Sequence, residues 1–174
     1  MTMTMTTGRG LKTILLGGLA AATLTLAACG ESEPETPVET AGTIPGMTIE
    51  NPRMVLGAVK GNPAAVYFNL KYDGDRGLTI RKAEVAQAGS ATLHDYGEYD
   101  FKVQMMEALP IPLTNGSEVE FKPGALHVMA FDPSPDLEPG DKAEVTITVS
   151  GGGTHTFEAD VLAAGDPRAD GDEG

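Results

Sequence analysis

Residues 65–72, AVYFNLKY, alternate apolar and polar side chains with a period of two. One parity holds the apolar side chains of Val66, Phe68, Leu70 and Tyr72. After Ala65, the other parity holds Tyr67, Asn69 and Lys71. This alternation is typical of a β-strand with one buried face and one face toward solvent.

Similar short segments, separated by turn residues, fill the central part of the chain. Segments 143–150 and 154–161 are separated by Gly151-Gly152-Gly153, which predicts a tight hairpin. No window longer than about ten residues sustains a helical apolar stripe. We therefore predict an all-β domain folded as an antiparallel Greek-key β-sandwich. Its expected strands are 65–72, 78–86, 91–96, 101–109, 117–121, 125–131, 143–150 and 154–161.

Two histidines and two methionines in this domain follow the spacing H-x10-M-x21-H-x-M. They are His94, Met105, His127 and Met129. Imidazole nitrogen and thioether sulfur are neutral ligands, and the thioether favours Cu(I) over Zn²⁺, Mg²⁺ or Ca²⁺. The four residues, called the ligand quartet below, therefore predict a copper site for Cu(I), with Cu(II) as the alternative oxidation state.

The first half of the ligand quartet lies on a predicted hairpin with a polar turn at 97–100. If the turn is centred between Tyr99 and Asp100, His94 lies directly opposite Met105. Directly opposed residues have Cβ atoms roughly 5 Å apart, a separation that suits two ligands of one ion.

The second half lies on a single strand. His127 and Met129 are two residues apart, so they share one face of that strand. Met106 and His155 are candidate accessory metal ligands. Packing is the alternative for both, because Met106 faces away from Met105 in a regular strand and His155 belongs to a terminal strand.

The spacing of the ligand quartet resembles the copper-binding motif of the periplasmic copper chaperones of the PCu(A)C type. The resemblance extends from about Ile49 to Val161 and includes FKPGALHVM at 121–129 and LEPGD at 137–141. It implies a cupredoxin-like β-sandwich that binds Cu(I) near its surface through the quartet. It also implies delivery of copper to the binuclear copper centre of cytochrome c oxidase. One departure is Asp95, where the family often has methionine.

The N-terminus has the pattern of a bacterial lipoprotein signal. Basic residues precede an apolar stretch that ends in Leu26-Ala27-Ala28-Cys29, a lipobox. We expect cleavage before Cys29 and lipidation of its thiol, with an ordinary signal peptide as the alternative. Because Gly30 is not aspartate, the pattern indicates outer-membrane sorting in a bacterium with two membranes. The expected location is the periplasm, anchored to the membrane by lipid.

These patterns divide the chain into four parts. Residues 1–28 are the predicted signal peptide, and 29–42 are the lipidated cysteine with an acidic, flexible tether. Residues 43–163 form the predicted copper-binding domain, and 164–174 a disordered acidic tail.

Composition and the absence of catalytic motifs argue against two further classes of function. The chain has 12 basic and 25 acidic residues, a formal net charge of −13, and no basic patch interleaved with aromatics, which argues against nucleic-acid binding. It has no G-x-S-x-G or H-E-x-x-H motif, so we expect no enzyme. We predict a copper chaperone whose partners are the copper ion and a cuproenzyme such as cytochrome c oxidase, or another copper-assembly protein.

Three alternatives compete with this prediction. An electron-transfer cupredoxin needs a cysteine ligand, and the single cysteine is Cys29 of the lipobox. A copper-sequestering lipoprotein for tolerance would use the same ligand quartet. A metal-free structural lipoprotein would leave the spacing of the quartet as a coincidence.

Overall fold

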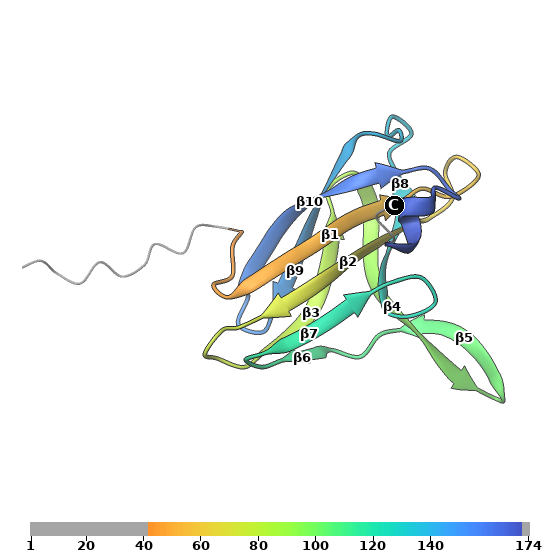
Figure 1. The fold of residues 1–174 in the computed structure, drawn as a ribbon. Helices are drawn as coiled ribbons and strands as arrows, with labels where there is room; N and C mark the ends of the chain where they lie inside the picture. Colours follow the sequence, from red (N-terminus) through yellow and green to blue (C-terminus); the bar gives the residue numbers. More distant parts are fainter. Residues whose placement is uncertain (1–41, 172–174) are drawn as a thin grey trace, which may run out of the picture. The chain divides into compact units, whose positions relative to one another are not determined.

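The structure is a computed structural model that describes residues 42–171. The predicted signal peptide and Cys29 lie outside the described residues, as does the tether up to residue 41. The described part contains strands and one short 3-10 helix, η1 (Figure 1). The bounds are β1 Met47–Val55, β2 Ala64–Tyr72, β3 Leu78–Val85, β4 Ala88–Tyr99, β5 Lys102–Glu107, β6 Ile111–Leu113, β7 Ser117–Phe121, β8 His127–Pro133, β9 Lys142–Val149, β10 Thr154–Leu162 and η1 Pro167–Asp170.

The strands form one hydrogen-bonded path in the order β5-β4-β8-β2-β1-β10-β9-β3-β6, and β7 pairs with β2. The path curls on itself, so β3 contacts β4 although the two strands are not paired. The prediction of an all-β fold is confirmed. One detail differs, because β1 and β10 pair in parallel while the other pairs are antiparallel.

The hairpin β9–β10 forms where the three glycines predict it. Gly151 and Gly152 have φ of 86° and 84°, a left-handed backbone that glycine adopts without steric cost. The hairpin lies between β1 and β3 in the strand order. The last strand of the domain, β10, therefore pairs with the first, β1.

The core contains the apolar parity of β2. Val66, Phe68 and Leu70 are fully buried. The Phe68 ring stacks on Phe121 of β7 at a centroid distance of 4.0 Å and meets the edge of Phe157 at 5.0 Å. The other face of β2 is only half-buried. It carries Tyr67, which lies near the candidate metal site described below.

The C-terminal segment differs from the predicted disordered tail over the residues that the structure describes. Asp166 caps η1 by accepting a hydrogen bond from the Arg168 amide. The side chain of Arg53 on β1 donates from Nε to the Ala169 carbonyl at 2.9 Å. A buried guanidinium needs acceptors, and this one holds the segment against β1. Within residues 42–171, no helix has the length and hydropathy needed to cross a membrane.

Candidate metal centre

The two histidines of the ligand quartet face each other across β4 and β8. His94 pairs directly with His127 in the antiparallel register, and the ring centroids are 5.9 Å apart. The core-facing residues of β8 are Val128 and Ala130, so His127 and Met129 share the opposite face as predicted. The histidine pair comes from strands that the sequence alone did not place side by side.

The predicted register of the β4–β5 hairpin is wrong. His94 lies opposite Glu107, and Met105 lies opposite Tyr96. The reason is the turn, because a two-residue loop of Asp100 and Phe101 joins the strands instead of the expected polar turn at 97–100. The observed register differs from the predicted one by two positions, since Met105 pairs with Tyr96 and not with His94. A shift by an even number of residues keeps side chains on their face, so Met105 remains on the same face as His94.

The two methionines flank the histidine pair on this face. Met105 is the diagonal neighbour of His94, and such Cβ atoms are roughly 7 Å apart, within reach of a long flexible side chain. Met129 lies two residues from His127 and pairs with Thr92 of β4. Register therefore brings all four members of the ligand quartet to one face of β5, β4 and β8.

The imidazole of His94 has a free nitrogen inside the protein. Its Nδ1 atom is buried and has no hydrogen-bond partner among the described residues. Burial and the neighbouring His127 lower the pKa of His94 below its ordinary value, while Glu107 opposes that shift. The ring is therefore neutral at neutral pH and can offer a lone pair to a metal ion.

His127 is oriented by the backbone. Its ring is buried, and Nδ1 lies 2.7 Å from the Ala125 carbonyl. A carbonyl only accepts, so Nδ1 carries the proton and Nε2 keeps the lone pair. Such a bond to the second nitrogen is what fixes metal-binding histidines in place.

Aromatic rings that the sequence did not assign to the site surround His127. Tyr67 of β2 and Tyr96 of β4 have centroids 6.3 and 5.9 Å from the His127 ring. The Arg53 guanidinium lies over Tyr67 at 5.4 Å. Burial raises the pKa of Tyr67, so its hydroxyl stays neutral beside the metal centre. The only sequence signal for Tyr67 is its place on the polar parity of 65–72.

Glu107 is a second residue that the sequence did not assign. It pairs with His94 and is exposed. A carboxylate is a harder ligand than a thioether and suits Cu(II). Glu107 could have been predicted as the neighbour of His94 only with the correct register of the turn. No group of three or more His, Cys, Asp or Glu side chains that could hold a metal occurs within the described range, so the donor set here depends on the methionines.

The candidate accessory ligands lie elsewhere. Met106 pairs with Asp95 and occupies the face of the hairpin opposite to Met105. Its side chain is 42% exposed, so it is not a core methionine either. The Ile44 amide donates a hydrogen bond to Nδ1 of His155 at 3.2 Å. This bond uses the lone pair of the neutral ring, which favours the packing role of His155.

His155 contributes to the pH dependence of stability. Burial lowers the pKa of its ring in the folded state, so the unfolded chain binds the proton more readily. The free energy of unfolding therefore falls as the pH drops below the ordinary histidine value of about 6.5. His155→Gln keeps an acceptor near Ile44 but cannot titrate. We expect its melting temperature to fall less between pH 7 and pH 5 than that of the unaltered chain. Parallel melting curves for the two proteins would contradict this role.

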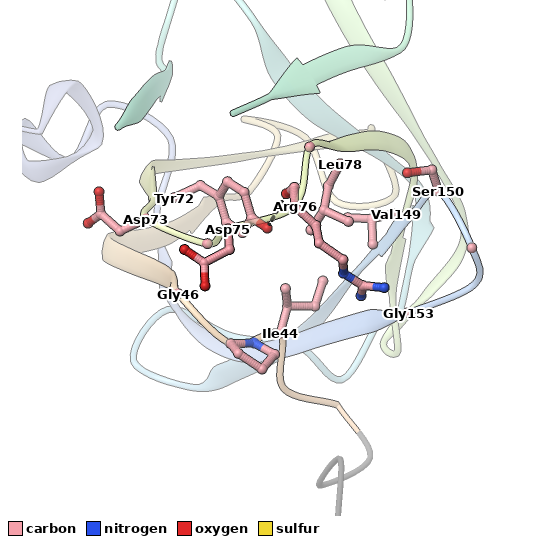
Figure 2. A pocket seen from close by; sticks show the side chains of 14 residues that line it. Ile44, Gly46, Tyr72, Asp73, Asp75, Arg76, Leu78, Val149, Ser150 and Gly153 are labelled. Atoms are coloured by element: carbon pink, nitrogen blue, oxygen red, sulfur yellow. Dashed lines mark hydrogen bonds between the residues drawn. The ribbon is translucent and has the colours of Figure 1, made fainter. Parts of the chain in front are cut away.

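A pocket of about 840 Å³ lies apart from the ligand quartet. It is formed by the β2–β3 and β9–β10 turns together with Ile44, as Figure 2 shows. Its lining mixes apolar side chains with the charges of Asp75 and Arg76 and includes no member of the quartet. The candidate metal centre is thus a face of the sheet and not this cavity.

Comparison with known proteins places the domain in a family. The model of the LpqE-like family, whose description is lipoprotein LpqE-like, matches residues 47–161. Protein RP573 of Rickettsia prowazekii (strain Madrid E) is 25% identical over 89 residues. The alignment covers 51% of this chain and 49% of that protein, so the chain spans about half the length of this relative.

Solved structures with the same fold are PCuAC domains. The copper-bound PCuAC domain from PmoF2 is 24% identical with a TM-score of 0.56, over 70% of this chain and 96% of that domain. The apo PCuAC domain from PmoF1 is 24% identical with a TM-score of 0.57, over 68% and 94%. The Cu(I) form of DR1885 from Deinococcus radiodurans is 20% identical with a TM-score of 0.53, over 78% and 90%. These likenesses confirm the cupredoxin-like fold of the PCuAC type.

Proposed function

The chain belongs to the LpqE-like family, and we propose that it is an extracytoplasmic copper chaperone. It binds Cu(I) through His94, Met105, His127 and Met129 and passes the ion to a cuproenzyme, the binuclear copper site of cytochrome c oxidase being the leading acceptor. Lipidation of Cys29 would hold it at the membrane, in the outer membrane if the cell has two.

The observation that carries the proposal is the facing histidine pair flanked by two thioethers. The rings of His94 and His127 are 5.9 Å apart, the buried Nδ1 of His94 has no hydrogen-bond partner within residues 42–171, and the His127 ring is fixed by the Ala125 carbonyl. Further support comes from two of the solved relatives, since the PmoF2 domain is described as copper-bound and DR1885 as the Cu(I) form.

The chemistry of the donor set suits carriage. Two neutral imidazoles and two neutral thioethers leave bound Cu(I) with a charge of +1, so the ion is held without a charged ligand. Met105 is 42% exposed, which allows an acceptor to replace the ligands in turn. A lipid anchor would raise the local concentration of the carrier near membrane oxidases.

X-ray absorption on the copper-loaded protein tests the site. We expect Cu(I) with two nitrogen and two sulfur scatterers, because the ligand quartet combines both donor types on one face. A shell of nitrogen and oxygen alone would reject the assignment. Sequestration would give the same spectrum, so the delivery step needs a strain that lacks this protein: delivery predicts lost oxidase activity that added copper restores, and sequestration predicts intact oxidase with copper sensitivity.

A further inference from the structure

The β4–β5 hairpin extends past the rest of the sheet. β4 pairs with β8 only as far as His94, and residues 95–99 pair with β5 alone. All six residues of β5 are exposed. Figure 1 shows the hairpin reaching away from the other strands of the domain.

The far half of this hairpin is unusually apolar for a solvated structure. Tyr99 is 69% exposed, Phe101 93% and Val103 74%. Among large hydrophobic side chains exposed within residues 42–171, only Val59 and Leu109 lie outside the hairpin. The register pairs Tyr99 with Lys102 and Val103 with Glu98, so Tyr99 and Val103 lie on the two faces of the hairpin, with Phe101 in the turn between them. Isolated exposed apolar residues are ordinary, but a group gathered at the end of one projecting element marks an interaction site. Tyr99, Phe101 and Val103 are called the tip below.

The turn itself carries an unfavourable residue. Asp100 and Phe101 have φ of 52° and 57°. Aspartate tolerates this left-handed conformation, whereas a bulky aromatic is rarely found there, and glycine would be the ordinary choice. The Phe101 ring is 93% exposed, so it gains almost no packing within the protein in return.

The charge of the hairpin restricts which class of partner can bind this surface. Around the apolar tip, the hairpin carries four carboxylates, at Asp95, Glu98, Asp100 and Glu107, against one ammonium at Lys102. A second copy of this acidic chain would place like charges together, and anionic lipid would be repelled as well. A protein surface with an apolar groove and a basic rim is complementary both to the apolar tip and to the carboxylates around it.

We propose that the tip is the docking surface for the copper acceptor, a protein with an apolar groove bordered by basic residues. The inference rests on the proposed copper carriage, because it names the surface that the acceptor recognises. Val103 lies two residues before Met105 on the same face of β5. Docking at the tip therefore brings the acceptor's own ligands beside the exposed thioether.

Copper transfer from the Cu(I)-loaded full chain tests the inference. The probes are the apo copper domain of cytochrome c oxidase, which must dock, and bathocuproine disulfonate, a chelator that need not. The variant combines Phe101→Gly, which also relieves the turn, with Val103→Thr, which keeps a β-branched residue. We expect transfer to the protein to slow by about tenfold or more, as for removal of an interface anchor, while Cu(I) affinity and transfer to the chelator stay unchanged. Val59→Thr, on another loop and 64% exposed, is the matched control and should transfer normally.

Each other outcome has a definite meaning. An unchanged rate to the oxidase domain overturns docking at the tip, and equal slowing to both probes shows that the tip retains copper instead. A blue-shifted emission of the Phe101→Trp variant on phosphatidylcholine–phosphatidylglycerol vesicles would assign the tip to lipid and overturn the inference. If the unaltered chain binds Cu(I) but never metallates the domain, the delivery function fails along with docking, whereas normal delivery by the tip variant removes docking alone.

Discussion

Replacing Met105 and Met129 together by leucine is expected to lower the affinity for Cu(I) by at least about 100-fold. Changes that only perturb the surroundings of a metal ligand already cost 10–100-fold, so loss of both sulfur donors costs more. Two imidazoles remain, and they leave Cu(I) with half of the proposed donor set. Leucine has nearly the volume of methionine, so the fold is retained.

The chain offers a matched control for this variant. Met106 lies next to Met105 and is equally exposed, at 42%, but on the opposite face of β5. Met106→Leu should therefore bind Cu(I) like the unaltered chain. The measurement is competition against a chromophoric Cu(I) chelator under reducing, oxygen-free conditions. Equal affinities for the double variant and the unaltered chain would remove the methionines from the site.

Most strands could be predicted from the sequence because one face of each is buried. The alternation in residues 65–72 fixed both the strand and its core face, and β2 matches it to within one residue. β1 was missed because Asn51-Pro52 interrupts it. Asn51 has φ of 50°, and the pairing with β2 shifts register at this point, as expected for a bulge. β6 was missed because it has three residues with Pro112 in the middle.

The turn and register of the β4–β5 hairpin could not be predicted from the local sequence. Polar residues at 97–100 indicated a turn, yet residues up to Tyr99 continue β4. The real loop puts an aromatic residue in a left-handed backbone, which no propensity favours. The face of Met105 was still predicted correctly, since parity survives an even slip. Its direct partner was not, and so Glu107 was missed.

The histidine pair could not be predicted from spacing at all. His94 and His127 meet because β8 inserts between β4 and β2, a pairing of strands that are distant in the chain. Such non-local order is set by how the whole core packs. Spacing gave the donor chemistry and the face of each residue, and the sheet order turned two separate pairs into one site.

The core behind the site supports the second large prediction. Phe68→Ala is expected to lower the free energy of unfolding by roughly 3–5 kcal/mol, since a fully buried phenylalanine leaves a cavity when truncated. The loss includes the stacked contact with Phe121 and the edge contact with Phe157. Denaturant unfolding of the apo protein measures it. Phe68→Leu, which keeps most of the apolar volume, should lose much less, and an equal loss would contradict the cavity as the main cause of the destabilisation.

The candidate site lies on the opposite face of the sheet from this core, on β4, β5 and β8, and β8 pairs with β2. A ligand that binds only the folded state stabilises it, by about 4 kcal/mol at 1,000 times its dissociation constant. Cu(I) at that excess should therefore restore Phe68→Ala to nearly the stability of the unaltered apo chain. Adding Met105→Leu and Met129→Leu to Phe68→Ala should reduce the restoration to about 1.4 kcal/mol or less, because a 100-fold weaker affinity leaves Cu(I) at only about ten times its dissociation constant. Undiminished rescue in this triple variant would mean that Cu(I) stabilises the fold from some other place on the chain.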